Sequence, residues 1–191
     1  MELHGDRLIP APLATTWAAL NDPETLKACI AGCESLERTG DDAYTAVVAL
    51  KIGPVSARFK GNLKMTNVTP PNGYTITFDG QGGVAGFGKG SADVKLSAEG
   101  EAATRLAYDA RAQVGGKMAQ IGSRLIDATA GKITDDFFKA FEAHLQAQLA
   151  PAGGLPAARP TPPAREAQPA GTLGWVLGAL VVLATLYFIF R

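Results

Sequence analysis

The chain of 191 residues is poor in cysteine and has no cationic run, and each of these absences excludes a class of protein. Its two cysteines, Cys29 and Cys33, are too few for a four-ligand zinc site, and neither His4 nor His144 lies near them in sequence. In a reducing compartment, we expect free thiols at the edge of a core rather than a redox pair. Without a basic patch or interleaved aromatic residues, the chain does not fit a nucleic-acid-binding protein.

Recognisable catalytic motifs are also missing. The stretch GQGGVAGFGKG has no Lys-Ser or Lys-Thr pair and no strand–loop–helix context, so a bulged or bent strand explains it better than a phosphate loop. No serine lies in a nucleophile elbow, and the neighbours Asp135 and Asp136 do not share a face of a helix. We therefore expect no catalytic residue and no metal ligand.

Charge disappears toward the C-terminus. Residues 150–172 are rich in proline, alanine and glycine, which predicts a linker with polyproline character. Residues 173–190 carry no charge, and a helix of about 18 residues at about 1.5 Å per residue is roughly 27 Å long, close to the thickness of a bilayer core. Trp175 and Tyr187 lie near its ends, as in an aromatic belt. This run predicts a transmembrane helix rather than a buried core helix.

The charges that flank this run predict its orientation. Arg159 and Arg165 precede it and only Arg191 follows, which favours a cytoplasmic N-terminal domain. The start of the chain, MELHGDRLIP, lacks the apolar segment of a secretory signal and agrees with this side. We expect a single-pass protein of the cell inner membrane with a C-terminal anchor.

Residues 1–149 predict one α+β domain. A strand over residues 2–9 is followed by two short helices, the second with Asp22 as its N-cap and Pro23 at its first position. Four or more strands follow, separated by the turns TGDDA, IGPVS and PPNGY. A long helix over residues 116–149 ends the domain. This order predicts a curved antiparallel sheet that wraps around the last helix.

Alternation along the strands predicts which side chains face that helix. Charged residues such as Lys51, Arg58 and Lys60 must face water, so the residues between them face inward. Much of this inner face is glycine or alanine, and a closed core would need that volume filled. We therefore favour a hollow apolar cavity over a tightly packed core. The expected lining consists of Val48, Leu50, Phe59, Leu63, Phe78 and Tyr108 from the strands, and Met118, Ile121 and Leu125 from the helix.

The second half of the predicted helix has a different pattern. Ile133, Phe137, Phe141 and Leu145 recur at every fourth residue, which predicts a stripe that packs on the sheet as ordinary core.

Several long segments resemble the CoxG family of carbon monoxide dehydrogenase subunits, which belongs to the START-like (SRPBCC) helix-grip superfamily. They are IPAPLATTWAALNDPETLKACIAGCESLE, KIGPVSARFKG, PPNGYTITFDGQGG, GFGKGSADVKL and AQVGGKMAQIGSRLIDATAGKITDDFFKAF. The resemblance covers roughly residues 1–145, and the linker and apolar tail are similar to those of membrane-tethered members. The family usually has proline where Ala31 stands, which affects only a turn.

The resemblance implies an accessory protein of a molybdenum hydroxylase, such as carbon monoxide dehydrogenase, that recruits the enzyme to the membrane. It also implies no cofactor of its own, and a quinone or other lipid as the expected cargo of the cavity. One alternative is a docking or assembly adaptor without a carrier role. The other is an enzyme that acts on an apolar substrate, for which the inner faces offer only Tyr44, Tyr74 and Tyr108 as polar groups.

Overall fold

The computed structural model describes residues 1–150, so the predicted transmembrane helix at 173–190 and all of the predicted linker but Ala150 lie outside it. No helix within residues 1–150 is both long and apolar enough to cross a membrane. The described elements are β1 (Glu2–Ile9), α1 (Leu13–Leu20), α2 (Pro23–Cys29), β2 (Cys33–Gly40), β3 (Ala43–Ile52), β4 (Val55–Thr69), β5 (Gly73–Gln81), η1 (Gly83–Ala85), β6 (Phe87–Ala98), β7 (Thr104–Gly115), η2 (Gly116–Ile121) and α3 (Ser123–Leu149), where η marks a 3₁₀ helix.

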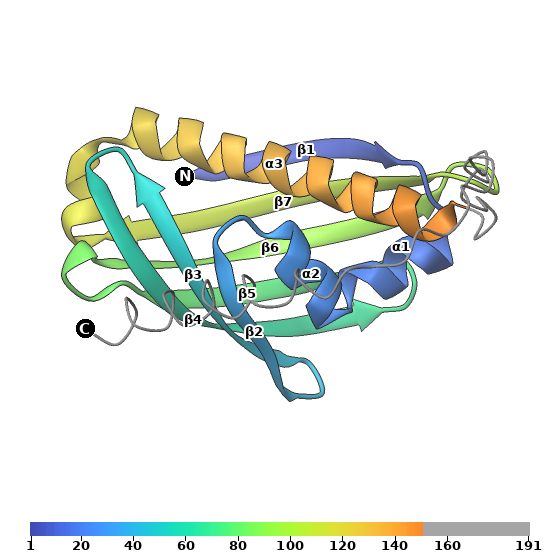
Figure 1. Cartoon of the computed structure of the whole chain (residues 1–191), viewed down its shortest axis with the longest axis horizontal. Helices are drawn as coiled ribbons and strands as arrows, with labels where there is room; N and C mark the ends of the chain where they lie inside the picture. The colour runs from blue at the N-terminus through green and yellow to red at the C-terminus, as the bar shows by residue number, and fades with distance from the viewer. Residues whose placement is uncertain (151–191) are drawn as a thin grey trace, which may run out of the picture. The chain divides into compact units, whose positions relative to one another are not determined.

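The strands form one curved antiparallel sheet in the order β1-β7-β6-β5-β4-β3-β2. Strands β2 to β7 follow one another as neighbours, whereas β1 crosses to pair with β7. In Figure 1, α3 runs across one face of this sheet, and α1 and α2 lie near its C-terminal half. The predicted α+β architecture, a sheet that grips a long helix, is confirmed.

The predicted alternation of the strands is confirmed as well. In β4, residues 56, 58, 60, 62 and 64 are exposed, and the residues between them are buried or half-buried. Strand β3 likewise buries Tyr44 and Ala46 and exposes Lys51. The inner face of the sheet is therefore the one that the charged residues predict.

Helix α2 begins as predicted. The Asp22 carboxylate accepts hydrogen bonds from the Thr25 backbone nitrogen at 3.0 Å and from the Thr25 hydroxyl at 2.6 Å, and Pro23 is the first helical residue. These two hydrogen bonds lower the pKa of Asp22 below its usual range. Helix α2 packs beside β2 at the edge of the sheet.

One end of the grip is solidly packed. Ile9, Phe141 and Leu145 are fully buried there, beneath α1. Two buried hydroxyls are satisfied within this core: Thr104 Oγ1 donates to the Ala11 carbonyl at 2.8 Å, and Thr16 Oγ1 lies 3.3 Å from Thr104 Oγ1. We call this region the packed end.

The long helix begins later than predicted. Residues 116–121 form η2, and α3 starts at Ser123, because Gly116 and Gly122 adopt φ angles of 77° and 100°. A right-handed α-helix cannot pass through such residues without a break. The prediction of one helix over 116–149 is therefore wrong in its first two turns.

Candidate ligand-binding cavity

An apolar cavity of about 450 Å³ lies between the inner face of the sheet and α3. This volume falls in the range of about 300–1,000 Å³ that is typical of small-molecule sites. Its walls come from β1, from β2 to β7, from α1 and α2, and from the middle of α3. The residues used below are Leu26, Ile30, Ala31, Tyr44, Leu63, Tyr74, Phe78, Ala92, Tyr108, Ala110, Ile133, Thr134 and Phe137.

The cavity is hollow where small residues face each other. Ala92 of β6 is paired with Ala110 of β7, and Leu3 of β1 is the next partner of Ala110. Two neighbouring alanines leave room that larger side chains would fill, because protein interiors are otherwise close-packed. The physical reason predicted for the cavity therefore applies to this pair.

Three of the nine residues predicted to line the cavity lie on its wall: Leu63, Phe78 and Tyr108. The other three strand residues, Val48, Leu50 and Phe59, are half-buried on the predicted face but away from the cavity. Val48 packs on the core cluster around Tyr44 and Met65, and the Phe59 ring covers Gly82. Alternation assigns a face correctly but does not say how far along the strand the hollow extends.

The three residues predicted from the helix, Met118, Ile121 and Leu125, do not line this cavity. Ile121 and Leu125 instead approach the β3–β4 turn, where a Cβ atom on Gly53 would lie 2.9 Å from Leu125 Cδ2. Leu125 is 42% exposed, and Met118 is buried in η2. The break at Gly122 separates Met118 and Ile121 from α3, and Leu125 lies in the first turn of α3, about two turns before Ile133.

Ile133 and Phe137 take their place, although their spacing predicts ordinary core. Both line the cavity, whereas Phe141 and Leu145 of the same stripe are fully buried at the packed end. A repeat of four residues identifies the face of a helix that turns inward. It cannot distinguish a side chain that meets a packed core from one that meets a void.

Polar groups are few on the wall of the cavity, and one of them is unsatisfied. The Tyr44 side chain is 5% exposed, and its buried hydroxyl has no hydrogen-bond partner within residues 1–150. Leaving such a group unpaired costs about 1–3 kcal/mol. Thr134, by contrast, donates its hydroxyl proton to the Ala130 carbonyl at 2.9 Å. The Tyr44 hydroxyl is therefore a buried donor beside the cavity that has no protein partner within residues 1–150.

Tyr74 lines the same part of the cavity, and its ring centroid is 5.6 Å from that of Trp17. Burial raises the pKa of Tyr74 far above its usual value, and the neighbouring Tyr44 adds a smaller increase. Its phenol therefore stays protonated at physiological pH. Uncharged, apolar surroundings that include the rings of Trp17 and Tyr44 suit an apolar ligand with a hydrogen-bond acceptor.

The cysteines lie outside this site. Cys29 and Cys33 are free thiols, as expected, and burial raises the pKa of both. Neither lines the cavity, and their protonated form is not the nucleophilic one.

Comparison with known proteins assigns a family. The family model of CoxG, a subunit of carbon monoxide dehydrogenase, matches residues 5–146. A conserved protein from Geobacillus kaustophilus is 31% identical, with a TM-score of 0.73 over 78% of this chain and 97% of that chain. No curated protein matches the chain.

More distant structures share the fold alone. A START superfamily protein from Mycobacterium smegmatis is 16% identical, with a TM-score of 0.59 over 77% of this chain and 98% of that chain. The Zhui aromatase/cyclase from Streptomyces sp. R1128 is 12% identical, with a TM-score of 0.60 over 81% of this chain and 99% of that chain. The START-like architecture is thus shared by proteins of very different sequence.

Proposed function

We propose, since this chain belongs to the CoxG family of carbon monoxide dehydrogenase subunits, that it is a non-enzymatic accessory protein of a molybdenum hydroxylase and carries an apolar ligand to that enzyme. The observation that carries the proposal is the apolar cavity of about 450 Å³ inside the matched region. Its polar side chains are three tyrosines and one threonine. A catalytic site for an apolar substrate would need a positioned acid, base or nucleophile beside such groups.

A quinone is the ligand that best fits the chemistry of the wall. Its carbonyl oxygens are acceptors for the unpaired Tyr44 hydroxyl, and its ring suits the aromatic surroundings of Tyr74. Other apolar lipids would fill the volume but would leave the Tyr44 hydroxyl unsatisfied unless they carried an acceptor at that point.

The apolar run at 173–190 gives this carrier a place to load. A ligand with a long hydrocarbon chain prefers the bilayer over water by about 0.8 kcal/mol per CH₂ group. We propose that residues 173–190 anchor the protein in the inner membrane, with the N-terminal domain in the cytoplasm and the segment at 150–172 as a tether. The domain would then collect its ligand at the membrane and recruit the hydroxylase there.

Mass spectrometry of lipids extracted from the purified full-length protein tests the carrier role. Detergent extracts always contain lipid, so the comparison uses two variants of β7. Ala110→Phe fills the cavity, and Ala107→Phe places the same ring on the opposite face of the same strand. We expect wild type and Ala107→Phe to retain about one quinone per chain, and Ala110→Phe to lose it.

Two other results would contradict the carrier role. Equal amounts of quinone in all three proteins would show that the cavity is not where it binds. No quinone in any of them, with the hydroxylase still recovered on membranes that carry this protein, would favour the docking adaptor instead.

A further inference from the structure

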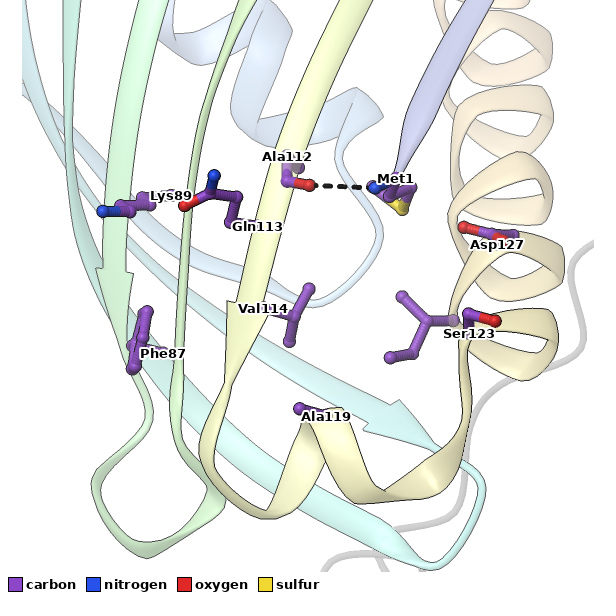
Figure 2. A pocket seen from close by; sticks show the side chains of 10 residues that line it. Met1, Phe87, Lys89, Ala112, Gln113, Val114, Ala119, Ser123 and Asp127 are labelled. Atoms are coloured by element: carbon purple, nitrogen blue, oxygen red, sulfur yellow. Dashed lines mark hydrogen bonds between the residues drawn. The ribbon is translucent and has the colours of Figure 1, made fainter.

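A second hollow, of about 530 Å³, opens near the start of α3. Figure 2 shows Val114 of β7 on one side of it, Ser123 and Asp127 of α3 on the other, and Ala119 of η2 between them. Met1, Phe87, Ala112 and Ile126 complete its apolar lining. We call this region the side opening.

The side opening exists because the sheet is incomplete at this point. Strand β7 continues to Gly115, but its pairing with β1 extends only to Arg111, followed by backbone hydrogen bonds between Ala112 and Met1 at 3.0 and 3.1 Å. Within the described residues, no strand lies beside residues 113–115 on that edge. The break at Gly122 then sets α3 apart from β7, which leaves a gap between helix and sheet.

The register of the sheet connects this gap to the cavity. Tyr44 is paired with Leu63, Leu63 with Phe78, Phe78 with Gly90, and Gly90 with Ala112. Residues directly opposite one another share a face of the sheet, so these five form one row across the inner face. The row begins at Tyr44 of β3 and ends at Ala112 in the side opening. Four strand spacings of about 4.8 Å make it about 19 Å long.

A single aromatic ring stands between the two hollows on this row. A Cβ atom on Gly90 would lie 2.7 Å from Phe78 Cζ, so the Phe78 ring lies over Gly90. Phe78 is only half-buried and lines the cavity. Gly90 has no side chain of its own, so the Phe78 ring is the side chain that covers this row between the cavity and the side opening.

We propose that the side opening is a chain-binding subsite. It takes the acyl or isoprenoid chain of the same ligand whose head group is held at Tyr44, and the chain passes Phe78 on its way. This inference rests on the proposed carrier function. It adds that the protein holds the hydrocarbon chain of the ligand as well as its head group. Lys89, Gln113 and Asp127 form the polar rim where such a chain leaves the protein.

Two soluble probes separate the head-group site from the chain site. The first is a dimethoxy-methyl-benzoquinone without a chain, and the second is the same ring with a decyl chain. Binding to the full-length protein in detergent is followed by quenching of Trp17, which contacts Tyr74, in a Trp175→Phe background. Partition of the decyl probe into detergent is the same for every variant, so differences between variants report on the protein.

We expect the decyl chain to lower the Kd of the wild type about tenfold or more. Ala112→Phe and Ala119→Phe, which each fill the side opening, should reduce this gain to below about threefold and leave the Kd of the chainless probe unchanged. Ala107→Phe, on the outer face of β7, should behave as the wild type. Circular dichroism establishes that each variant is folded.

The outcomes are distinguishable. If both filling variants fold and keep the full gain from the decyl chain, the chain-binding subsite is wrong and the carrier function stands. If neither probe binds the wild type, the carrier function fails, and the subsite fails with it.

A measurement on the unmodified chain makes the test independent of the folding of any variant. A decyl quinone with a diazirine at the end of its chain is photolysed in complex with the wild type. We expect adducts on residues 112–126. Adducts that avoid this segment would overturn the subsite.

Discussion

The two halves of α3 pack differently against one sheet. Phe141 and Leu145, in the C-terminal half, are fully buried where α1 contributes Thr16, Ala19 and Leu20 as a further layer. Phe137 and Ile133, about one and two turns before Phe141 on the same stripe, face the cavity. The apolar stripe continues unchanged along both halves of α3. The difference in packing therefore comes from the elements that face each half. The C-terminal half of α3 therefore contributes to the stability of the fold, and the half before it lines the space for a ligand.

The largest expected effect is a difference between two truncations on α3. Leu145→Ala removes a fully buried side chain from the packed end and should lower the free energy of unfolding by about 2–5 kcal/mol. Ile133→Ala only enlarges an existing void, so its cost should be at least about 1 kcal/mol smaller. Urea denaturation measures both. Equal costs would contradict the division of the helix into a packed and a hollow half.

The buried hydroxyls of the packed end give the next largest effect. Thr104→Val keeps the shape of the side chain but removes the 2.8 Å hydrogen bond to the Ala11 carbonyl and the contact with the Thr16 hydroxyl, which leaves only the longer 3.4 Å contact between Thr16 and that carbonyl. We expect a loss of about 1–3 kcal/mol in the free energy of unfolding, with ligand binding unchanged. Thr77→Val, on the exposed face of β5, is the matched control and should change stability by less than about 0.5 kcal/mol. A similar loss in both variants would show that the buried network has no special role.

The sequence predicts the architecture well, because the fold depends on patterns that repeat over many residues. Polar residues at every second position, three of them charged, settle the inner face of β4, and Asp22 followed by Pro23 marks the start of α2. The start of α3 is less predictable. Gly122 occurs within a helical pattern, and only the structure shows its φ of 100°. A glycine that merely weakens a helix and one that breaks it look the same in a sequence.

The site is less predictable than the fold, since a void depends on distances between elements. Leu63, Phe78 and Tyr108 lie on the wall of the cavity, and Phe59 shares their face but covers Gly82 instead. The sequence does not predict Leu26, Ile30 and Ala31 on the wall of the cavity, because the contact between α2 and the sheet produces no periodic pattern of apolar residues. Alternation along the strands identifies Tyr44, Tyr74 and Tyr108 as the few polar groups that face inward. It does not indicate that the Tyr44 hydroxyl has no partner within residues 1–150.

Tyr44→Phe tests the part of the domain around the cavity, because it should raise the stability of the protein and weaken its binding of the ligand. It removes the buried unpaired hydroxyl, so the ligand-free protein should gain about 1 kcal/mol in the free energy of unfolding. The quinone loses its hydrogen bond, and its Kd should rise by up to about tenfold. The control is Tyr108→Phe, because the Tyr108 hydroxyl lies on the same face but beside Gly5 of β1, near the opposite edge of the sheet from β3. Unchanged binding in Tyr44→Phe would show that Tyr44 does not hold the head group.

The smallest expected effect concerns α2, which contributes Leu26 to the wall of the cavity. Asp22→Ala removes the N-cap of α2, which supports Leu26 and Ile30 on the cavity wall, and should cost about 1 kcal/mol. The hydrogen bonds from Thr25 lower the pKa of Asp22 in the folded state. The contribution is therefore present above about pH 4, the usual pKa of an aspartate, and is lost as the pH falls through the lower folded value.

Thermal unfolding of wild type and Asp22→Ala between pH 2 and pH 7 measures this dependence. The gap between the two proteins should be full at neutral pH and should close in acid. Asp22→Asn separates the hydrogen bond from the charge, because asparagine caps a helix about as well as aspartate and does not titrate. It should keep most of the stability at every pH. If instead the gap persisted at the lowest pH, the cap would act through its shape rather than through its carboxylate. The wall of the hollow half would then not depend on the ionisation of Asp22.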